Sequence, residues 1–171
     1  MKINEVVHNY KLYNNNQGNR VVGVGDEFAI PGFDMATYTV KGAGFLGEFE
    51  QPVPGHIKSI ETEIPFMIMD TEAFEMLGDK LNITIRGSYL GLNTETNDDV
   101  YTPVRIVMKG KNKGFEGGKL KLTEGTETKL KAELWYCLIE IGGESMFELD
   151  KFNSIYKVYG KDMLAEVNKY C

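Results

Sequence analysis

The longest alternating stretch of the chain is TETKLKAELWYCLIEIGG, residues 126–143. Its first face is apolar throughout, with Leu130, Ala132, Leu134, Tyr136 and Leu138. Its second face begins with charged side chains and turns apolar at Trp135, Cys137, Ile139 and Ile141. This period of two predicts one strand of some 15 residues, about 50 Å long. Such a strand is far longer than usual, and Gly142-Gly143 predicts a hairpin into ESMFELD, residues 144–150.

Three other stretches alternate in the same way. In residues 56–68 the inner set is Ile60, Thr62, Ile64 and Phe66, and the outer set includes Glu61 and Glu63. In residues 80–90 the inner set is Leu81, Ile83 and Ile85, and the outer set is Lys80, Asn82, Thr84 and Arg86. In residues 101–111 the inner set is Val104, Ile106 and Met108. The chain is therefore predicted to be mainly β, an antiparallel β-barrel or sandwich.

Two segments have helical spacing. DTEAFEMLGDK, residues 70–80, predicts a short helix with Asp70 or Thr71 as its cap, Phe74 and Leu77 turned inward, and Gly78 as its end. GKDMLAEVNKY, residues 160–170, predicts an amphipathic C-terminal helix that places Met163, Leu164, Val167 and Tyr170 near one face. The glycines of VVGVGDEFAIPG, residues 21–32, indicate a strand that another backbone approaches closely, because no helix follows to bind a phosphate.

One segment, about 34–55, does not fit the strand pattern. Its TVKGAGFLGEFEQPVPGH stretch, residues 39–56, combines Gly42, Gly44 and Gly47 with an apolar set that includes Phe45, Leu46 and Phe49. A contiguous apolar set on a flexible arm is typical of a docking site. The alternative is a lid that packs over the end of its own barrel. Residues 1–171 are thus expected to form a single domain with an extended arm.

Composition narrows the class of protein. The 171 residues are enough for a core, and 42% hydrophobic with 26% charged content is ordinary for a globular chain. The net charge of −6 argues against a surface that clamps nucleic acid. Two cysteines are too few for a disulfide scaffold and favour a reducing compartment. The first residues lack the pattern of a signal peptide, and no apolar run is long enough to predict a membrane span or anchor.

No group of residues predicts catalysis. His8 and His56 are isolated from metal-ligand spacing, and Cys137 lies in a strand without a basic neighbour, so a buried inert thiol is expected. Glu61 and Glu63 are adjacent on one strand face, where surface carboxylates are common. The chain is therefore predicted to be neither an enzyme nor a holder of a metal or cofactor. A monomeric β-barrel that binds a small apolar ligand or glycan between Trp135, Tyr136 and Tyr89 remains an alternative, and an enzyme with an unrecognised site is a weaker one.

The order of the motifs resembles that of the major tail tube proteins of contractile-tailed phages and related phage-tail-like particles. Three stretches carry the resemblance: IPGFDMATYTVKGAGFLGEFEQP (30–52), MKGKNKGFEGGKLKLTEGTETKLKAELWYCLIEIGGE (108–144) and ELDKFNSIYKVYGKDMLAEV (148–167). The first matches a proline-ended strand followed by an aromatic arm with a glycine kink. The second matches a glycine-rich turn before a long strand, and the third matches a closing segment that ends in a helix.

The resemblance implies a structural role. Members form β-barrel subunits that close into hexameric rings, and the rings stack into a hollow tube inside a contractile sheath. The arm reaches a neighbouring subunit or ring, which implies Val40, Phe45, Leu46 and Phe49 as contact residues. The implied partners are other copies of the chain, the tail sheath, baseplate and tail terminator proteins, and DNA or an effector in the lumen. The implied location is a virion tail or tail-like particle assembled in the bacterial cytoplasm.

Charge adds an expectation about the lumen. Six chains of −6 would carry about −36, six times the charge of one chain. If Glu61 and Glu63 line the lumen, their charge repels passing DNA, and Lys80 and Arg86 on another strand would moderate that repulsion.

Overall fold

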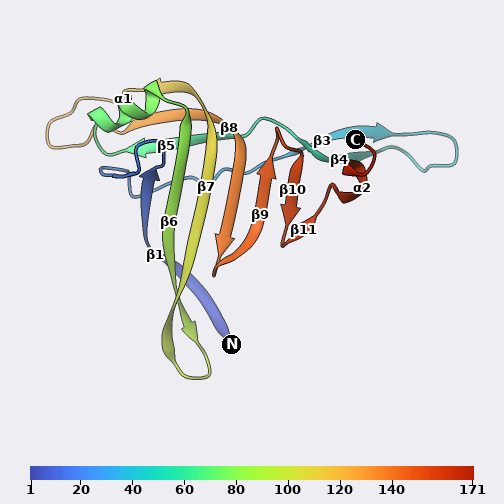
Figure 1. Cartoon of the computed structure of the whole chain (residues 1–171), viewed down its shortest axis with the longest axis horizontal. Coiled ribbons are helices and arrows are strands. Elements are labelled where there is room, and N and C mark those ends of the chain that lie inside the picture. The colour runs from blue at the N-terminus through green and yellow to red at the C-terminus, as the bar shows by residue number, and fades with distance from the viewer.

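The computed structural model describes residues 1–171 as one large antiparallel sheet with a separate two-stranded hairpin (Figure 1). The order along the main sheet is β11-β10-β9-β8-β7-β6-β1-β2, and β5 pairs with β8 beside that path. Its strands are β1 (Lys2–Asn14), β2 (Asn19–Val21), β5 (Glu61–Phe66), β6 (Leu81–Asn93), β7 (Asp98–Glu116), β8 (Thr128–Ile141), β9 (Glu144–Asp150), β10 (Ile155–Val158) and β11 (Lys161–Asp162). The predicted class, mainly β and antiparallel with two helices, is confirmed.

The long strand predicted within residues 126–143 forms as β8, but the side chains that face the core change from even to odd positions along it. Leu134 pairs with Gly110 and Tyr136 pairs with Lys109, so Trp135 is an extra residue on β8. Successive side chains of a strand point to opposite faces, so this extra residue, a β-bulge, shifts the alternation by one position. Even-numbered side chains face the core before Trp135, and odd-numbered ones face it afterwards. Cys137 is therefore buried, whereas Tyr136 turns outward toward Lys109. The prediction that Tyr136 and Leu138 continue the stripe of Leu134 was wrong beyond Trp135.

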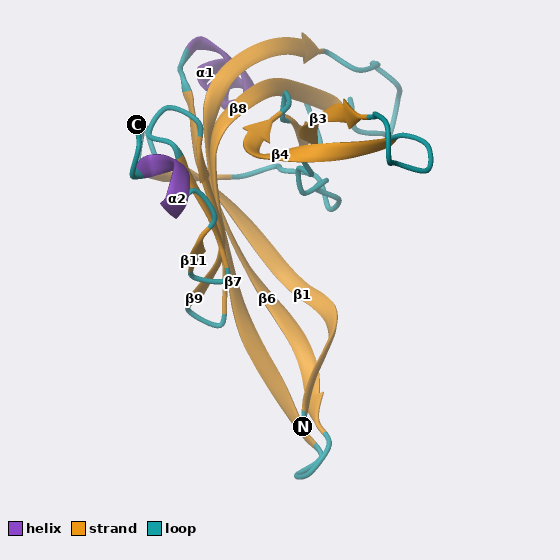
Figure 2. Ribbon diagram, turned by 90° about the vertical axis from the view of Figure 1, so that its right-hand side faces the viewer, coloured by secondary structure: helices purple, strands orange, loops and turns teal.

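β8 also joins two parts of the sheet. Its first half pairs with β5, with Glu61 opposite Glu133, and its second half pairs with β9 from Tyr136 onward. The chain bends where these partners change, and Figure 2 shows the upper part of the sheet curving over the lower part. The Gly142-Gly143 hairpin is confirmed, with φ of +64° and +85° at the two turn glycines. β7, with 19 residues, and not β8, with 14, is the longest strand.

The two parts enclose the core without forming a closed barrel. An isolated bridge joins Val24 to Phe66, and the amide of Gly25 donates to the carbonyl of Pro65 at 2.9 Å. These bonds connect the end of β2 to β5, so the sheet approaches itself without a continuous ladder. Residues 21–32 are not one strand as predicted, but the close approach of another backbone at Gly25 is confirmed, since the Pro65 carbonyl oxygen lies 2.9 Å from the Gly25 amide nitrogen and 3.8 Å from a Cβ placed at Gly25.

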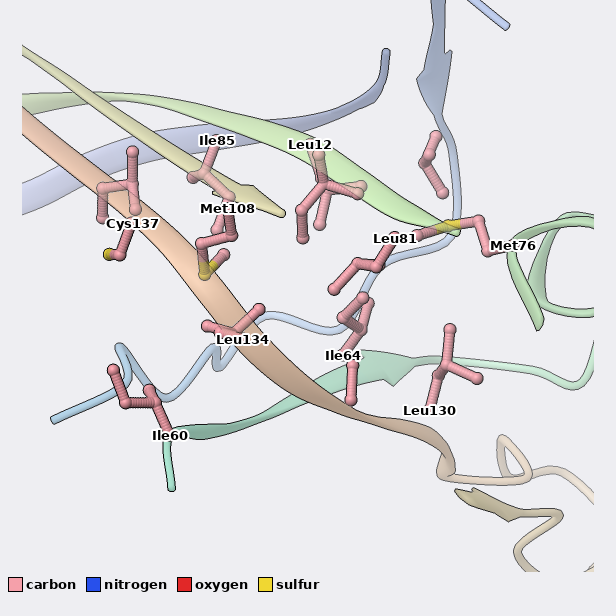
Figure 3. Close-up of a cluster of buried hydrophobic side chains, with 14 of the residues drawn as sticks. Leu12, Ile60, Ile64, Met76, Leu81, Ile85, Met108, Leu130, Leu134 and Cys137 are labelled. Atoms are coloured by element: carbon pink, nitrogen blue, oxygen red, sulfur yellow. The ribbon is translucent and has the colours of Figure 1, made fainter. Parts of the chain in front are cut away.

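The core lies between these layers (Figure 3). It contains Leu12, Ile60, Ile64, Leu81, Ile83, Ile85, Ile106, Met108, Leu130, Leu134 and Cys137, among others. The inner sets predicted for residues 60–66, 81–85 and 104–108 are all buried. Thr84, predicted to point outward, is buried as well, since its hydroxyl bonds to the Asn15 side chain.

Both helices differ from their predictions. α1 (Thr71–Gly78) is capped by the Asp70 side chain, ends at Gly78 and packs Leu77 on the core, all as expected. Ala73 and Met76 also face the core, whereas Phe74, predicted to turn inward, is half exposed beside Phe115. α2 (Ala165–Asn168) is a single turn, because residues 161–162 pair with β10 as β11. Of the predicted apolar face of the C-terminal helix only Leu164 is buried. Neither helix has the length or the apolar run needed to cross a membrane.

Candidate assembly surfaces

The predicted arm is a β-hairpin that stands apart from the main sheet. β3 (Met35–Val40) pairs only with β4 (Phe49–Ile57), and the turn between them contains Gly44 and Gly47 with φ of +95° and +99°. Glycine adopts this left-handed backbone without the steric cost that a side chain would add. The base of the hairpin is held by its own chain, where Met35 and Ile57 pack on the core. The remainder extends outward to one end of the long axis of the molecule (Figure 1).

The apolar residues at the turn, residues 41–49, form what we call the arm tip. Phe45, Leu46 and Phe49 are 56%, 108% and 48% exposed, and the rings of Phe45 and Phe49 meet edge to face at 6.2 Å. Val40, on β3 at the start of the turn, is partly exposed. The alternative that this arm is a lid on its own barrel end is wrong for the tip, because these side chains do not contact the core.

Two more exposed apolar regions were not predicted. The first half of β1 and the β6–β7 hairpin form an extension in which Val6, Val7 and Tyr101 are each more than half exposed (Figure 2). The loop between β7 and β8, residues 117–127, exposes Leu120 and Leu122 almost fully at the opposite end from the arm tip. The sequence carried a signal for the extension, since β1 begins with apolar side chains on both faces instead of one.

The expected lumen residues Glu61 and Glu63 lie on the face of β5 that points away from the core. The Glu61 carboxylate pairs with Lys113, and Glu63 lies 3.4 Å from Lys129 and 3.8 Å from Lys131. The hydrogen bond from Lys113 lowers the pKa of Glu61 below its ordinary value. Both carboxylates therefore lie in a cluster of mixed charge, which also holds Glu133 opposite Glu61 and Glu116 beside Lys131.

Lys80 and Arg86 are exposed, just before β6 and on it. β7 and β8 separate β6 from β5 in the sheet, so the two cations are not on a strand next to Glu61 and Glu63. Arg86 stands in register with Lys11 on one side and Arg105 on the other. We call this outward side of the main sheet the polar face; it also carries Lys109 and Glu140, and Arg105 pairs with Glu140 at 2.8 Å. Glu148 and Asp150 on β9 lie on this face as well, beside Tyr136 and Lys109, so the polar face holds both cations and carboxylates.

A hollow beside β1, which we call the β1 groove, has a volume of about 660 Å³. Its lining comes from β1, the segment 20–30, Met67 and the facing parts of β6 and β7. Its wall is fixed, because the Tyr10 hydroxyl donates to the carbonyl of Gly25 and the Met67 amide donates to the carbonyl of Gly23 at 2.8 Å. The lining is mainly apolar, and Val7, Val22, Ile30 and Met67 are each more than half exposed around it.

Other residues considered from the sequence do not form a common site. The pocket proposed between Trp135, Tyr136 and Tyr89 is absent: Trp135 packs on Phe152, Tyr136 contacts Lys109, and only Tyr89 lines the β1 groove. Cys137 is buried as expected, and burial raises the pKa of its thiol to about 11.

Both histidines are exposed and lie on different strands. His8 on β1 meets the ring of Tyr101 edge to face at 5.7 Å, and His56 is on β4. Neither belongs to a cluster of metal-ligating side chains.

Comparison with known proteins identifies the family of the chain. Over 88 residues the chain is 33% identical to a tail tube protein of Escherichia phage P2, in an alignment that covers 52% of this chain. That alignment spans about half the length of the relative, 49%. The sequence profile of the family described as phage tail tube protein FII matches residues 4–170, nearly the whole chain. The chain therefore belongs to the phage tail tube protein FII family.

Proposed function

We propose that this protein is a structural subunit that closes into hexameric rings, and that these rings stack into the inner tube of a contractile tail. The observation that carries the proposal is the exposed apolar arm tip on a folded subunit of this family. A lone copy leaves Phe45, Leu46 and Phe49 in water, and burial of apolar side chains is the main driving force for association. The role is mechanical: the tube conducts DNA or an effector, and no bond is made or broken.

The sheet edges support ring closure. β1 pairs with β2 only at Leu12–Asn14, so its earlier residues leave backbone groups unpaired along one edge. β11 forms the other edge of the same sheet. A cyclic arrangement in which one edge meets the next subunit removes both edges and fixes the number of copies. The number six comes from the family resemblance and not from the geometry of one chain.

The polar face is our candidate for the lumen wall. In this proposal Arg86 and Lys80 face the lumen together with Glu61 and Glu63, and lysines beside the two glutamates balance their charge. DNA binds strongly where clustered cations release its counterions. Ion pairs such as Arg105–Glu140 leave fewer free cations, so DNA would slide past without being held.

The outer surface of such a tube would contact the tail sheath, and its two ends would contact the baseplate and the tail terminator protein. Assembly would take place in the bacterial cytoplasm before the tube becomes part of a virion tail or a tail-like particle.

Negative-stain electron microscopy of the purified protein tests the proposal. We expect rings or hollow rods from the full chain, and folded subunits without rods when residues 42–50 are deleted. Circular dichroism of the deletion variant serves as the folding control, since the removed residues lie outside the core. Normal rods from the deletion variant, or isolated particles from the full chain at every concentration, would contradict the proposal.

A further inference from the structure

We propose that the β1 groove is the receptor for the arm tip of a second copy of this chain. The inference rests on the proposed function, because it names the contact through which subunits of the tube hold one another. Each feature is incomplete in one copy: the tip is an apolar projection without a cover, and the groove is an apolar hollow without an occupant.

Shape and chemistry match between the two. The tip presents two phenylalanine rings and one leucine on a narrow hairpin. The groove offers about 660 Å³ with Val22, Ile30 and Met67 at its opening. Aromatic side chains that enter a preformed apolar hollow are the usual anchors of a protein interface. The hydrogen bonds that fix segment 22–28 to β1 and β5 hold the groove open before the tip arrives.

Charges around the two features are also complementary. Arg20, Asp26 and Glu27 are charged residues that line the groove. The tip is flanked by Lys41 before the turn and by Glu48 and Glu50 after it.

None of these six charged residues, three at the groove and three at the tip, takes part in an ion pair within the chain. A second copy can place the glutamates of its tip beside Arg20, and its Lys41 beside Asp26 and Glu27. Complementary charge at the rim of an interface fixes the orientation of the partner.

The contact must join different copies. The tip lies at one end of the long axis, and the upper end of β1, beside the groove, lies toward the opposite end (Figure 1). Because the surface on one copy differs from the surface on its partner, the contact is heterologous, and such contacts propagate into rings or open stacks. One pair of features can therefore either close a ring or extend a stack.

Two single variants and their mixture test the docking. Leu46→Glu places a carboxylate on the tip, and Val22→Glu places one in the groove; both positions are exposed, so each variant folds. Each variant alone should need at least about a hundredfold higher concentration to grow rods, because the new charge would be buried without a partner. In the mixture, the intact tip of the Val22→Glu protein meets the intact groove of the Leu46→Glu protein. An affinity tag on one variant should then retain the other, although neither retains an untagged copy of itself.

The control is Tyr170→Glu, an equally exposed apolar site outside both features, which should grow rods as the unaltered chain does. A direct measurement uses Leu46→Cys and Val22→Cys in a Cys171→Ser background: oxidation should yield a disulfide between copies and none within a copy.

The results separate the two proposals. If the unaltered chain forms rods but the mixed variants do not associate and the cysteines do not crosslink, the docking is overturned and the tube function stands. If the unaltered chain stays monomeric and its groove takes up an apolar dye, both proposals are overturned.

Discussion

Replacing Phe45, Leu46 and Phe49 together by alanine should greatly weaken assembly and leave the subunit stable. The exposed fractions of the three side chains together equal about two fully exposed side chains. Burial of one such side chain contributes about 1.5–3 kcal/mol, so the interface loses about 3–6 kcal/mol per subunit. Each 1.4 kcal/mol is a factor of about ten, which predicts a rise of about 10²- to 10⁴-fold in the concentration needed for rod growth.

Light scattering and sedimentation across a dilution series measure that concentration. Urea unfolding, carried out below the assembly concentration, checks the isolated subunit. We expect a change in its unfolding free energy within about 0.5 kcal/mol, because the tip does not contact the core. Rod growth at an unchanged concentration would refute the reasoning. A large loss of subunit stability would do so as well, since it would mean that the tip packs on its own chain.

Three further outcomes test the fold. A Cβ at Gly110 would lie 2.0 Å from the carbonyl oxygen of Glu133, so Gly110→Ala should lower the unfolding free energy by about 1–3 kcal/mol; an unchanged urea midpoint would oppose the close approach. The Asn112 amide donates to three carbonyls at the end of α1, so Asn112→Ala should cost about 1–3 kcal/mol and speed amide exchange in α1, and unaltered exchange would contradict this role. In the native protein only Cys171 should react quickly with a thiol reagent, whereas Cys137 should react after unfolding; rapid labelling of both would contradict the burial. Because the pKa of Cys137 is raised from 9.0 to about 11, its contribution to stability is present below pH 9 and declines as the pH rises toward 11.

Periodicity predicted the β architecture well where one face of a strand is buried along its length. Ile60 through Phe66 and Leu81 through Ile85 follow this rule, and both sets lie in the core. The rule failed at Trp135 because a β-bulge depends on the partner strand, and residue spacing within one strand does not report its partner. It failed again in the C-terminal segment, where pairing of residues 161–162 with β10 overrides helical spacing.

The candidate assembly surfaces were predicted unevenly. The exposed set of Phe45, Leu46 and Phe49 could be predicted because these residues share one glycine-rich segment, and local composition is visible in a sequence. The β1 groove was not found, because its wall combines β1, segment 20–30, Met67 and two central strands that only the fold brings together. Whether Glu61, Glu63, Lys80 and Arg86 face a lumen stays a prediction, since that property belongs to the assembled ring.

Sedimentation velocity of the purified chain, from micromolar to the highest soluble concentration, tests most directly whether the exposed apolar surface of one copy drives it to associate with other copies. The account predicts that the 19.3 kDa species gives way to rings and longer rods as the concentration rises. A single 19.3 kDa boundary at every concentration, with the phenylalanines near residue 45 shielded from solvent, would contradict it.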